Sequence, residues 1–328
     1  MNANHANATL SATLVFAGLW AGLALGAAQP GRPGRTVRHA VSQAATPSGV
    51  PGNSPAQAPT DAEIRARSDK LIANQHRDDK ALDEYERVER HRDLTAGANP
   101  HTIEDHTYRV VPNGGGTQKI LLKDAGKPTD PAEYRRQLQA WESVLEIMLK
   151  PNDSRTKTAQ EKYDKRMHER ADLVDAMKDA YTVKWLGLET RNGRLCDVIQ
   201  LDPNPNFHPR SIFQEALAHA TAKIWVDHTE DQLVRGEALI THDISVGGGI
   251  VGKLYRGSSF SMEQAEVSPS IWLPTRYQYD FTGRKFFFGF EQHQIIDASR
   301  YRRVGPPKEA LALVESELAS GKTFSEDP

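Results

Sequence analysis

The sequence has little cysteine, with Cys196 the only one in 328 residues. A single cysteine cannot form an internal disulfide, so the fold must be held together by its hydrophobic core. Cys196 lies in the run RLCDVIQL, which predicts a small buried residue on a strand, with a reactive thiol as the less favoured alternative. Because no cysteine directly follows the apolar N-terminal run, lipid attachment at that point is excluded.

The sequence also lacks an excess of charge of one sign. It contains 41 Lys and Arg against 43 Asp and Glu, for a formal net charge of −2, and 38% of its residues are hydrophobic. This composition is ordinary for a soluble globular protein and gives no global signal for nucleic acid. We therefore expect no nucleic-acid partner.

Motifs of catalysis are missing as well. The sequence has no H-E-x-x-H, no Cys-x-x-Cys and no G-x-S-x-G. The segment VDHTED (226–231) gathers four possible ligands, for which a solvated turn is the favoured interpretation and a cation site the alternative. We expect no catalytic constellation, no metal and no cofactor, and hence no enzyme. An exported hydrolase without a recognisable motif is kept as an alternative.

One long apolar run lies at the N-terminus. Residues 9–28, TLSATLVFAGLWAGLALGAA, carry no charge and end in small residues. They predict a signal peptide over 1–28, cleaved at or near Ala28, and a periplasmic or secreted protein, with a membrane anchor as the alternative. Residues 29–60 are rich in Pro and Gly and contain no acidic residue, which predicts a disordered linker or, as the alternative, a tether to a surface.

Helical patterns dominate the next part of the chain. Thr60 and Glu63 form a capping box that starts a helix predicted over 61–92. Two further helices are predicted over 131–179, the first starting at Asp130 and the second capped by Thr158. A short helix is predicted within 209–222 and another over 306–319, with a tail to 328. Between the first two helices, 106–123 predicts two strands around an Asn-Gly turn.

From Tyr181 onward, apolar and polar residues alternate as in β-strands. Asn192 and Gly193 predict the turn of a hairpin over 181–203. Further strands are predicted at 223–227, 232–246, 250–257, 271–281 and 284–296, with turns at HTED, the glycines, VSPS and TG.

The segment DISVGGGIVGKLY (243–255) contains both G-x-G-x-x-G and G-x-x-x-x-G-K. A phosphate-binding loop needs a helix after it and Ser or Thr after the lysine. Here Leu254 occupies the Ser/Thr position, and the preceding segment alternates as an antiparallel strand with one solvated face does. We therefore predict a hairpin loop at 247–249 and no bound nucleotide.

Aromatic residues are concentrated in the predicted strands after residue 180. Period 2 places Tyr277, Tyr279 and Phe281 on one face of their strand. These residues either fill an ordinary core or line a cavity for an apolar ligand. In the second case, strand residues form the cavity face, and one stripe of the helix starting at Asp130 lies over that face as a lid. The candidate ligand-binding residues are Val234, Ala238, Ile240, Ile244, Tyr277, Tyr279, Phe281, Phe286, Phe288 and Phe290 on the strands, and Leu138, Trp141, Leu145 and Met148 on the helix.

Three segments resemble a known family. KIWVDHTEDQLVRGEALI (223–240), GGGIVGKLYRGSSF (247–260) and IWLPTRYQYDF (271–281) resemble the outer-membrane lipoprotein-sorting-like proteins of the LolA/LolB superfamily, periplasmic lipoprotein carriers. The resemblance implies an open antiparallel half-barrel closed by helices, which holds lipid acyl chains on its concave face and is not an enzyme.

The expected fold class is therefore α+β, a curved antiparallel sheet covered by helices. One domain over 61–305 would follow the signal peptide and linker, and 306–328 would add the C-terminal helix and tail. The expected partner is a lipid or a lipoprotein acyl chain. A structural or adaptor protein with a packed core, bound to another envelope protein, is the alternative.

Overall fold

The computed structural model describes residues 58–246, 249 and 251–321. The predicted signal peptide, most of the predicted linker and the tail after residue 321 lie outside the described part of the chain. Among the helices that are described, none is both long and apolar enough to cross a membrane.

Long segments of the described chain are strands. Their bounds are β1 (Tyr85–Leu94), β2 (Thr102–Pro112), β3 (Thr117–Asp124), β4 (Lys127–Pro128), β5 (Tyr181–Arg191), β6 (Arg194–Pro203), β7 (Ala220–Asp227), β8 (Leu233–Ile240), β9 (Ile244–Val246), β10 (Gly252–Leu254), β11 (Ser259–Ser268), β12 (Ile271–Lys285) and β13 (Phe288–Arg303). The helices are α2 (Asp61–Leu82), α3 (Pro131–Met148), α4 (Ser154–Ala180), α5 (Ile212–Ala218) and α6 (Pro307–Ser320).

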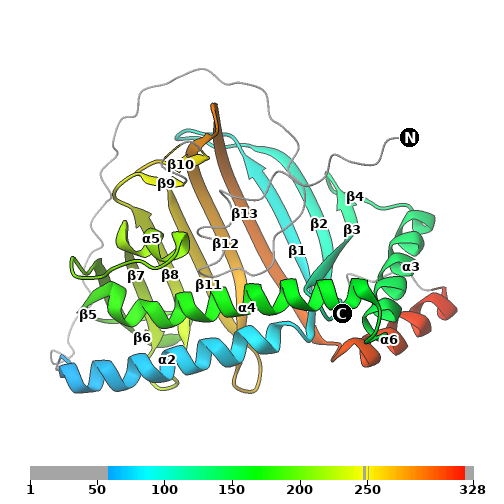
Figure 1. Cartoon of the computed structure of the whole chain (residues 1–328), viewed down its shortest axis with the longest axis horizontal. Coiled ribbons are helices and arrows are strands. Elements are labelled where there is room, and N and C mark those ends of the chain that lie inside the picture. Colours follow the sequence, from blue (N-terminus) through cyan, green and yellow to red (C-terminus); the bar gives the residue numbers. More distant parts are fainter. Residues whose placement is uncertain (1–57, 247–248, 250, 322–328) are drawn as a thin grey trace.

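The strands of the described residues form one 13-stranded antiparallel sheet (Figure 1). The main path runs β4-β3-β2-β1-β13-β12-β11-β8-β7-β6-β5, and the short β10 pairs with β12 and β9. Within the described chain the two end strands, β4 and β5, do not pair with each other, so the sheet is open. The predicted α+β fold, an antiparallel sheet that is not closed into a barrel and carries helices, is confirmed.

Several local signals in the sequence place elements correctly. The Thr60 side chain accepts a hydrogen bond from the Glu63 backbone N–H, completing the capping box of α2. Asp130 caps α3. Asn192 and Gly193 join β5 to β6 with φ of 52° and 78°, the left-handed pair that this hairpin turn requires.

The helix predicted over 61–92 is wrong beyond Leu82, because Tyr85–Leu94 form β1 in the middle of the sheet. The charged residues of β1 are paired with residues far away in the sequence, which no local pattern reveals. Glu86, for example, is buried and lies 2.6 Å from both Arg109 of β2 and Arg302 of β13. Because these ion pairs satisfy the charges, a strand rich in charge can lie inside the sheet.

The other corrections concern element boundaries. The α4 helix starts one turn before the predicted Thr158, because Asp153 accepts a hydrogen bond from the Arg155 backbone N–H and acts as its cap. The strand predicted over 232–246 is interrupted at 241–243. The strand β11 was not predicted. The turn predicted at 282–283 is wrong, since β12 continues to Lys285.

The glycine-rich segment forms a hairpin. The strands β9 and β10 pair antiparallel with Val246 opposite Gly252, and β10 then pairs with β12 rather than leading into a helix. Most of the loop predicted at 247–249 lies outside the described residues. The Lys253 ammonium is 2.9 Å from an Asp243 carboxylate oxygen. In the described part of this segment, Lys253 therefore lies on a hairpin strand and is paired with a carboxylate, and no helix directly follows it.

The sheet has two faces, which we call inner and outer. The inner face is the one that α2 and α4 cross (Figure 1). Because residues in register across strands share a face and neighbours along a strand alternate, the inner face can be followed across the sheet. Its members in one row from β6 to β1 are Ile199, Ile224, Gly236, Met262, Tyr277, Ile296 and His91.

Candidate functional site

The largest hydrophobic cluster lies on the inner face. It joins buried residues of the central strands to Leu173 of α4 and to Ala216 and Leu217 of α5. Of the predicted ligand-binding residues, it contains Ile240, Ile244, Tyr277, Tyr279 and Phe281, with Ala238 and Phe290 packed against it. These residues therefore lie together on one face of the sheet. Whether they contact a ligand stays a prediction.

Aromatic rings form the centre of this cluster. Tyr279 is opposite Phe260 of β11, with ring centroids 5.2 Å apart, and its ring meets that of Phe281 edge-on at 5.6 Å. Tyr277 lies 6.3 Å from Tyr279. Phe260 and Met262 were missed because β11 was not predicted, although their alternation with serine is the period-2 signal of a strand.

Val234 does not join the inner face. It packs with Cys196, Val198, Trp225 and Trp272 in a separate cluster. The register between β7 and β8 shifts between Trp225 and Val226, and such a bulge reverses which side chains point inward. Cys196 is a buried strand residue, as predicted, and burial raises the pKa of its thiol.

Phe286 and Phe288 also lie elsewhere. They stand at the tip of the β12–β13 hairpin and are 48% and 79% exposed. The prediction that they share the inner face with Phe290 fails because the turn falls at Phe286 and Phe287, four residues after its predicted place.

The stripe of α3 does not cover the aromatic face. Leu138, Trp141 and Leu145 belong to a second cluster with strand residues of β1–β3 and with α6. Val88 of this cluster lies three positions from His91, which faces inward, so alternation places Val88 on the outer face. The other strand members of the second cluster share that face: Val111, Ile120 and Leu122.

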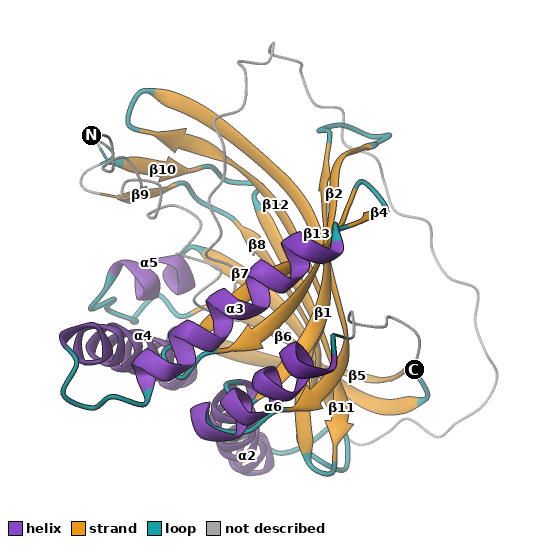
Figure 2. Cartoon of the chain, turned by 90° about the vertical axis from the view of Figure 1, so that its right-hand side faces the viewer, coloured by secondary structure: helices purple, strands orange, loops and turns teal. Residues whose placement is uncertain are grey.

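The prediction that this stripe covers the aromatic face is therefore wrong. Trp141 donates its indole N–H to the Pro112 carbonyl at 2.9 Å, which ties α3 to the end of β2. The Met148 methyl lies near the β2–β3 turn, 3.4 Å from a Cβ built on Gly115. Figure 2 shows α3 and α4 as separate helices on the sheet. An amphipathic stripe gives the covering side of a helix but not the face that it covers.

The inner face is instead covered by α2 and α4. Their apolar contributions to the cluster are few: Leu71 from α2, and Leu173, Ala176, Met177 and Ala180 from α4. Most of the side chains that α2 buries are polar: Gln75, Asp78 and Asp79, beside Leu82. An aromatic sheet face is thus covered by helices with little apolar surface.

Ion pairs join α2 to α4 and α2 to the sheet. Arg170 of α4 pairs with buried Asp79, Lys178 lies 2.5 Å from Asp69, and Asp175 lies 3.0 Å from His76. The two helices are therefore connected along their length.

One arginine of α2 makes several contacts with the sheet. Arg67 donates to Asp197 of β6 and to Asp231 of the β7–β8 turn, both at 2.5 Å. Burial alone would raise the pKa of Asp197, but hydrogen bonds from His228 and Arg67 hold it below its usual value. In the VDHTED segment, Asp227 accepts backbone bonds from Thr229 and Glu230 in a turn. The positive charge next to this turn is therefore the Arg67 guanidinium.

Buried charge continues the inner face beyond the aromatic rings. Arg87 and His91 of β1 both contact Glu89, at 2.6 and 2.7 Å. Burial would raise the pKa of Glu89, but the Arg87 charge and the His91 hydrogen bond lower it to about 2. The Tyr279 hydroxyl is buried and has no hydrogen-bond partner among the described residues. An unpaired buried hydroxyl is costly, so this atom is suited to contact a ligand.

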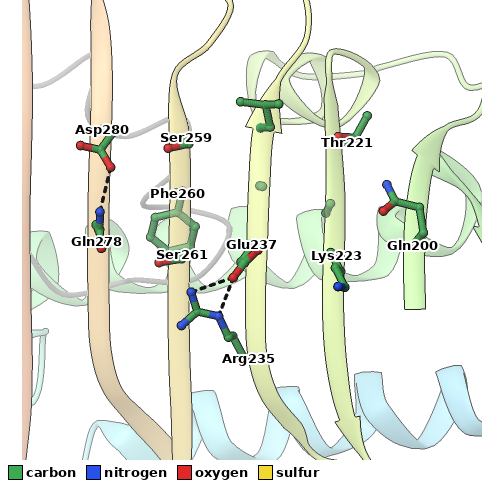
Figure 3. Close-up of a pocket in the computed structure, with 13 residues that line it drawn as sticks. Gln200, Thr221, Lys223, Arg235, Glu237, Ser259, Phe260, Ser261, Gln278 and Asp280 are labelled. Atoms are coloured by element: carbon green, nitrogen blue, oxygen red, sulfur yellow. Dashed lines mark hydrogen bonds and ion pairs between the residues drawn. The ribbon is translucent and has the colours of Figure 1, made fainter. Parts of the chain in front are cut away.

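Two cavities lie near these elements. The apolar one, about 50 Å³, lies between α2 and β5–β7 and is lined by Ile64, Leu71, Ile199, Leu201 and Ile224 among others. The larger one, about 300 Å³, is a polar depression where Arg235, Glu237, Ser261 and Gln278 point away from the helices (Figure 3). Ligand pockets commonly measure about 300–1,000 Å³. The apolar cavity next to α2 is therefore well below this range in volume.

Among the residues that the structure describes, no group of His, Cys, Asp and Glu is arranged to hold a metal ion. No protein-family model and no curated protein matches the chain. Solved structures do. The chain is similar to a LolA superfamily protein from Nitrosomonas europaea, at 11% identity over 75% of this chain and 96% of that one, with a TM-score of 0.31.

Two further solved structures are similar at comparable identity and TM-score. A putative outer membrane lipoprotein-sorting protein domain from Vibrio parahaemolyticus is 10% identical over 72% of this chain and 92% of its own, with a TM-score of 0.29. A DUF1329 family protein from Desulfovibrio piger is 13% identical over 73% and 92%, with a TM-score of 0.28. The likeness concerns the fold alone.

Proposed function

We propose that this protein binds an apolar chain, such as a lipid or lipoprotein acyl chain, between the aromatic inner face and the helices α2 and α4. The observation that carries the proposal is the mismatch between the two surfaces. The sheet presents Phe260, Tyr277, Tyr279 and Phe281, whereas most of the side chains that α2 buries are polar. The rings are buried in this structure, and an acyl chain would cover them in place of the helices once the helices move away.

The ion pairs between α2 and α4 favour movement of the two helices as one unit. Burying one Leu or Met side chain contributes roughly 1.5–3 kcal/mol, and the two helices place only a few such residues on the cluster. Ion pairs connect the helices to each other, while α2 is bound to the sheet through Arg67 and Asn74 and, at its end, through Leu82. We call α2 and α4 the lid. Opening it would expose the aromatic rings to water, a cost that a bound apolar chain would offset by covering them again.

The Tyr279 hydroxyl supports a place for the polar end of such a ligand. It is the buried polar atom next to the rings that lacks a protein partner, and it lies near the charged group of Arg87 and Glu89. A carboxyl or ester oxygen could accept a hydrogen bond from this hydroxyl. The apolar chain would then extend from Tyr279 along the ring face.

We infer a periplasmic or secreted location from the predicted signal peptide over 1–28. The proposed role includes no catalytic step, because the sequence offers no nucleophile or metal motif. It includes no nucleotide, since Lys253 is paired with Asp243 on a hairpin.

One observation favours a second candidate. The apolar cavity below α2 measures only about 50 Å³, which suits a packed core as well as a closed lid. In that case the protein is a structural or adaptor component that binds another envelope protein through its surface, and the lid does not open.

A fluorescent fatty acid distinguishes the two candidates. We expect the wild type to bind it, Ile240→Trp to weaken binding by filling the inner face, and Leu239→Trp to bind normally. Leu239 is the matched control, because it is the next residue of β8 and is exposed on the other face. Urea unfolding of both variants separates lost binding from lost folding, since overpacking at Ile240 costs about 1–3 kcal/mol. A folded wild type that binds no fatty acid would favour the adaptor.

A further inference from the structure

The tip of the β12–β13 hairpin exposes consecutive phenylalanines. Phe286, Phe287 and Phe288 are 48%, 88% and 79% exposed. In Figure 1 the tip projects at the top of the sheet, away from α2 and α4 at the bottom. Exposed apolar side chains that stand singly are ordinary, but a contiguous group marks an interaction surface. The large exposed hydrophobics Val251 and Tyr255 lie on the adjoining segment.

The turn itself is strained by its sequence. Lys285 pairs with Phe288, so Phe286 and Phe287 form a two-residue turn, and Phe286 has a φ of 53°. A positive φ at this first position is normally taken by glycine, and a bulky residue there is an outlier. A phenylalanine in this strained position motivates the hypothesis that the ring has a role at the tip.

The tip is firmly held by its neighbours. Its two strands are the longest of the described sheet, and the Phe286 N–H donates to the Val251 carbonyl at 3.0 Å. Below the tip, Gly283 leaves room for the Phe290 ring and the Lys253 carbonyl, which would lie 2.8 and 2.3 Å from an added Cβ. The rings are therefore presented on a supported projection.

Basic side chains surround the tip. Lys253, Arg256, Arg284 and Lys285 lie on the strands and turn beside it. The acidic groups there are Asp243, which pairs with Lys253, and Glu291, opposite Thr282 of β12. The tip thus combines apolar rings at its end with an excess of positive charge behind them.

We propose that this tip docks the protein on a bilayer that contains anionic phospholipid. Rings at the end of a projection can enter the region between headgroups and acyl chains, and basic residues one step behind them lie level with anionic headgroups. A protein partner would not require apolar rings at the end of the projection with basic residues behind them. This inference does not depend on what the inner face binds.

Vesicle flotation tests the proposal with the exported protein, free of residues 1–28. We expect the wild type to float with vesicles that contain phosphatidylglycerol and less with pure phosphatidylcholine. The double variant Phe287→Ser/Phe288→Ser should have a partition coefficient into these vesicles that is lower by ~tenfold or more, because it lacks the two exposed rings that would transfer from water into the bilayer. The matched control is Ile103→Ser, which removes another exposed apolar side chain, 62% exposed, at the start of β2.

Two further variants separate the contributions. Arg256→Glu should weaken binding to the anionic vesicles only. Phe286→Gly should raise Tm, because glycine relieves the positive φ, and should still lower vesicle binding. Equal flotation of wild type and double variant, or none for the wild type, would overturn the proposal. So would a wild type that dimerises without lipid through rings that the double variant removes, since the tip would then bind a second copy.

Discussion

The unpaired hydroxyl of Tyr279 predicts the direction in which its removal changes the free energy of unfolding. Replacing Tyr279 with phenylalanine keeps the ring and removes only the buried oxygen. Because the hydroxyl has lost its water contacts on folding without gaining a partner, its removal should raise the free energy of unfolding by about 1–3 kcal/mol. For a domain of this size that corresponds to a Tm increase of roughly 2–4 °C per kcal/mol.

A matched variant should show the opposite sign. Tyr134 is also buried, but its hydroxyl oxygen accepts a hydrogen bond from the Arg109 guanidinium at 2.9 Å. Removing this oxygen with Tyr134→Phe should lower the free energy of unfolding by about 1–2 kcal/mol, toward the low end for bonds to charged groups, since Arg109 keeps Glu317 as a partner. Urea unfolding of both variants, with the same m-value as the wild type, measures the two effects.

The fatty-acid affinity of Tyr279→Phe supplies a second readout. If this hydroxyl contacts the polar end of a ligand, the variant is more stable and yet binds more weakly. Loss of stability in Tyr279→Phe comparable to that in Tyr134→Phe would refute the reasoning, because the hydroxyl would then have a partner in the folded protein.

Three other predictions concern single positions. Burial raises the pKa of Asp78 from 3.8 to about 6, so the folded protein binds this proton more tightly than the unfolded chain does. The free energy of unfolding, relative to that of Asp78→Asn, should therefore fall as pH rises from about 4 to 6 and stay constant above pH 6. Urea unfolding at several pH values measures this. Gly283→Ala should lower the free energy of unfolding by about 1–3 kcal/mol, because the added Cβ would meet the Phe290 ring. Gly289→Ala makes only an ordinary contact and should change it by under about 0.5 kcal/mol, so equal effects of the two variants would contradict the packing. Lys253→Ala should cost under about 1 kcal/mol, as expected for a partly exposed ion pair, and ATP should not change Tm; a nucleotide-dependent increase would revive the phosphate loop.

Local chemistry predicted the elements whose cause is local. The Thr60 capping box, the Asp130 cap and the Asn192-Gly193 turn each act within a few residues, and each is found where the sequence indicates. The alternation of Tyr277, Tyr279 and Phe281 likewise gave their common face. These features follow from backbone geometry and period alone.

The elements that were mispredicted depend on distant partners. The strand β1 is charged because Glu86 and Arg87 find ion pairs inside the sheet, so its period could be taken for that of a helix. Val234 points outward because of a bulge in β7–β8, and α3 covers the outer face because α6 packs beside it. The bulge depends on how β8 pairs with β7, and the face that α3 covers depends on its packing with α6, so neither follows from the period of one segment.

The central claim is that an apolar chain lies between the aromatic face and α2 and α4. Photocrosslinking with a diazirine-bearing fatty acid, followed by mass spectrometric mapping, tests it most directly. The account predicts labels on inner-face residues such as Phe260, Tyr277 and Tyr279 and on the lid at Leu71 or Leu173, and competition by unlabelled fatty acid. Labels confined to the outer depression around Arg235 and Gln278, or no labelling that fatty acid competes away, would contradict it.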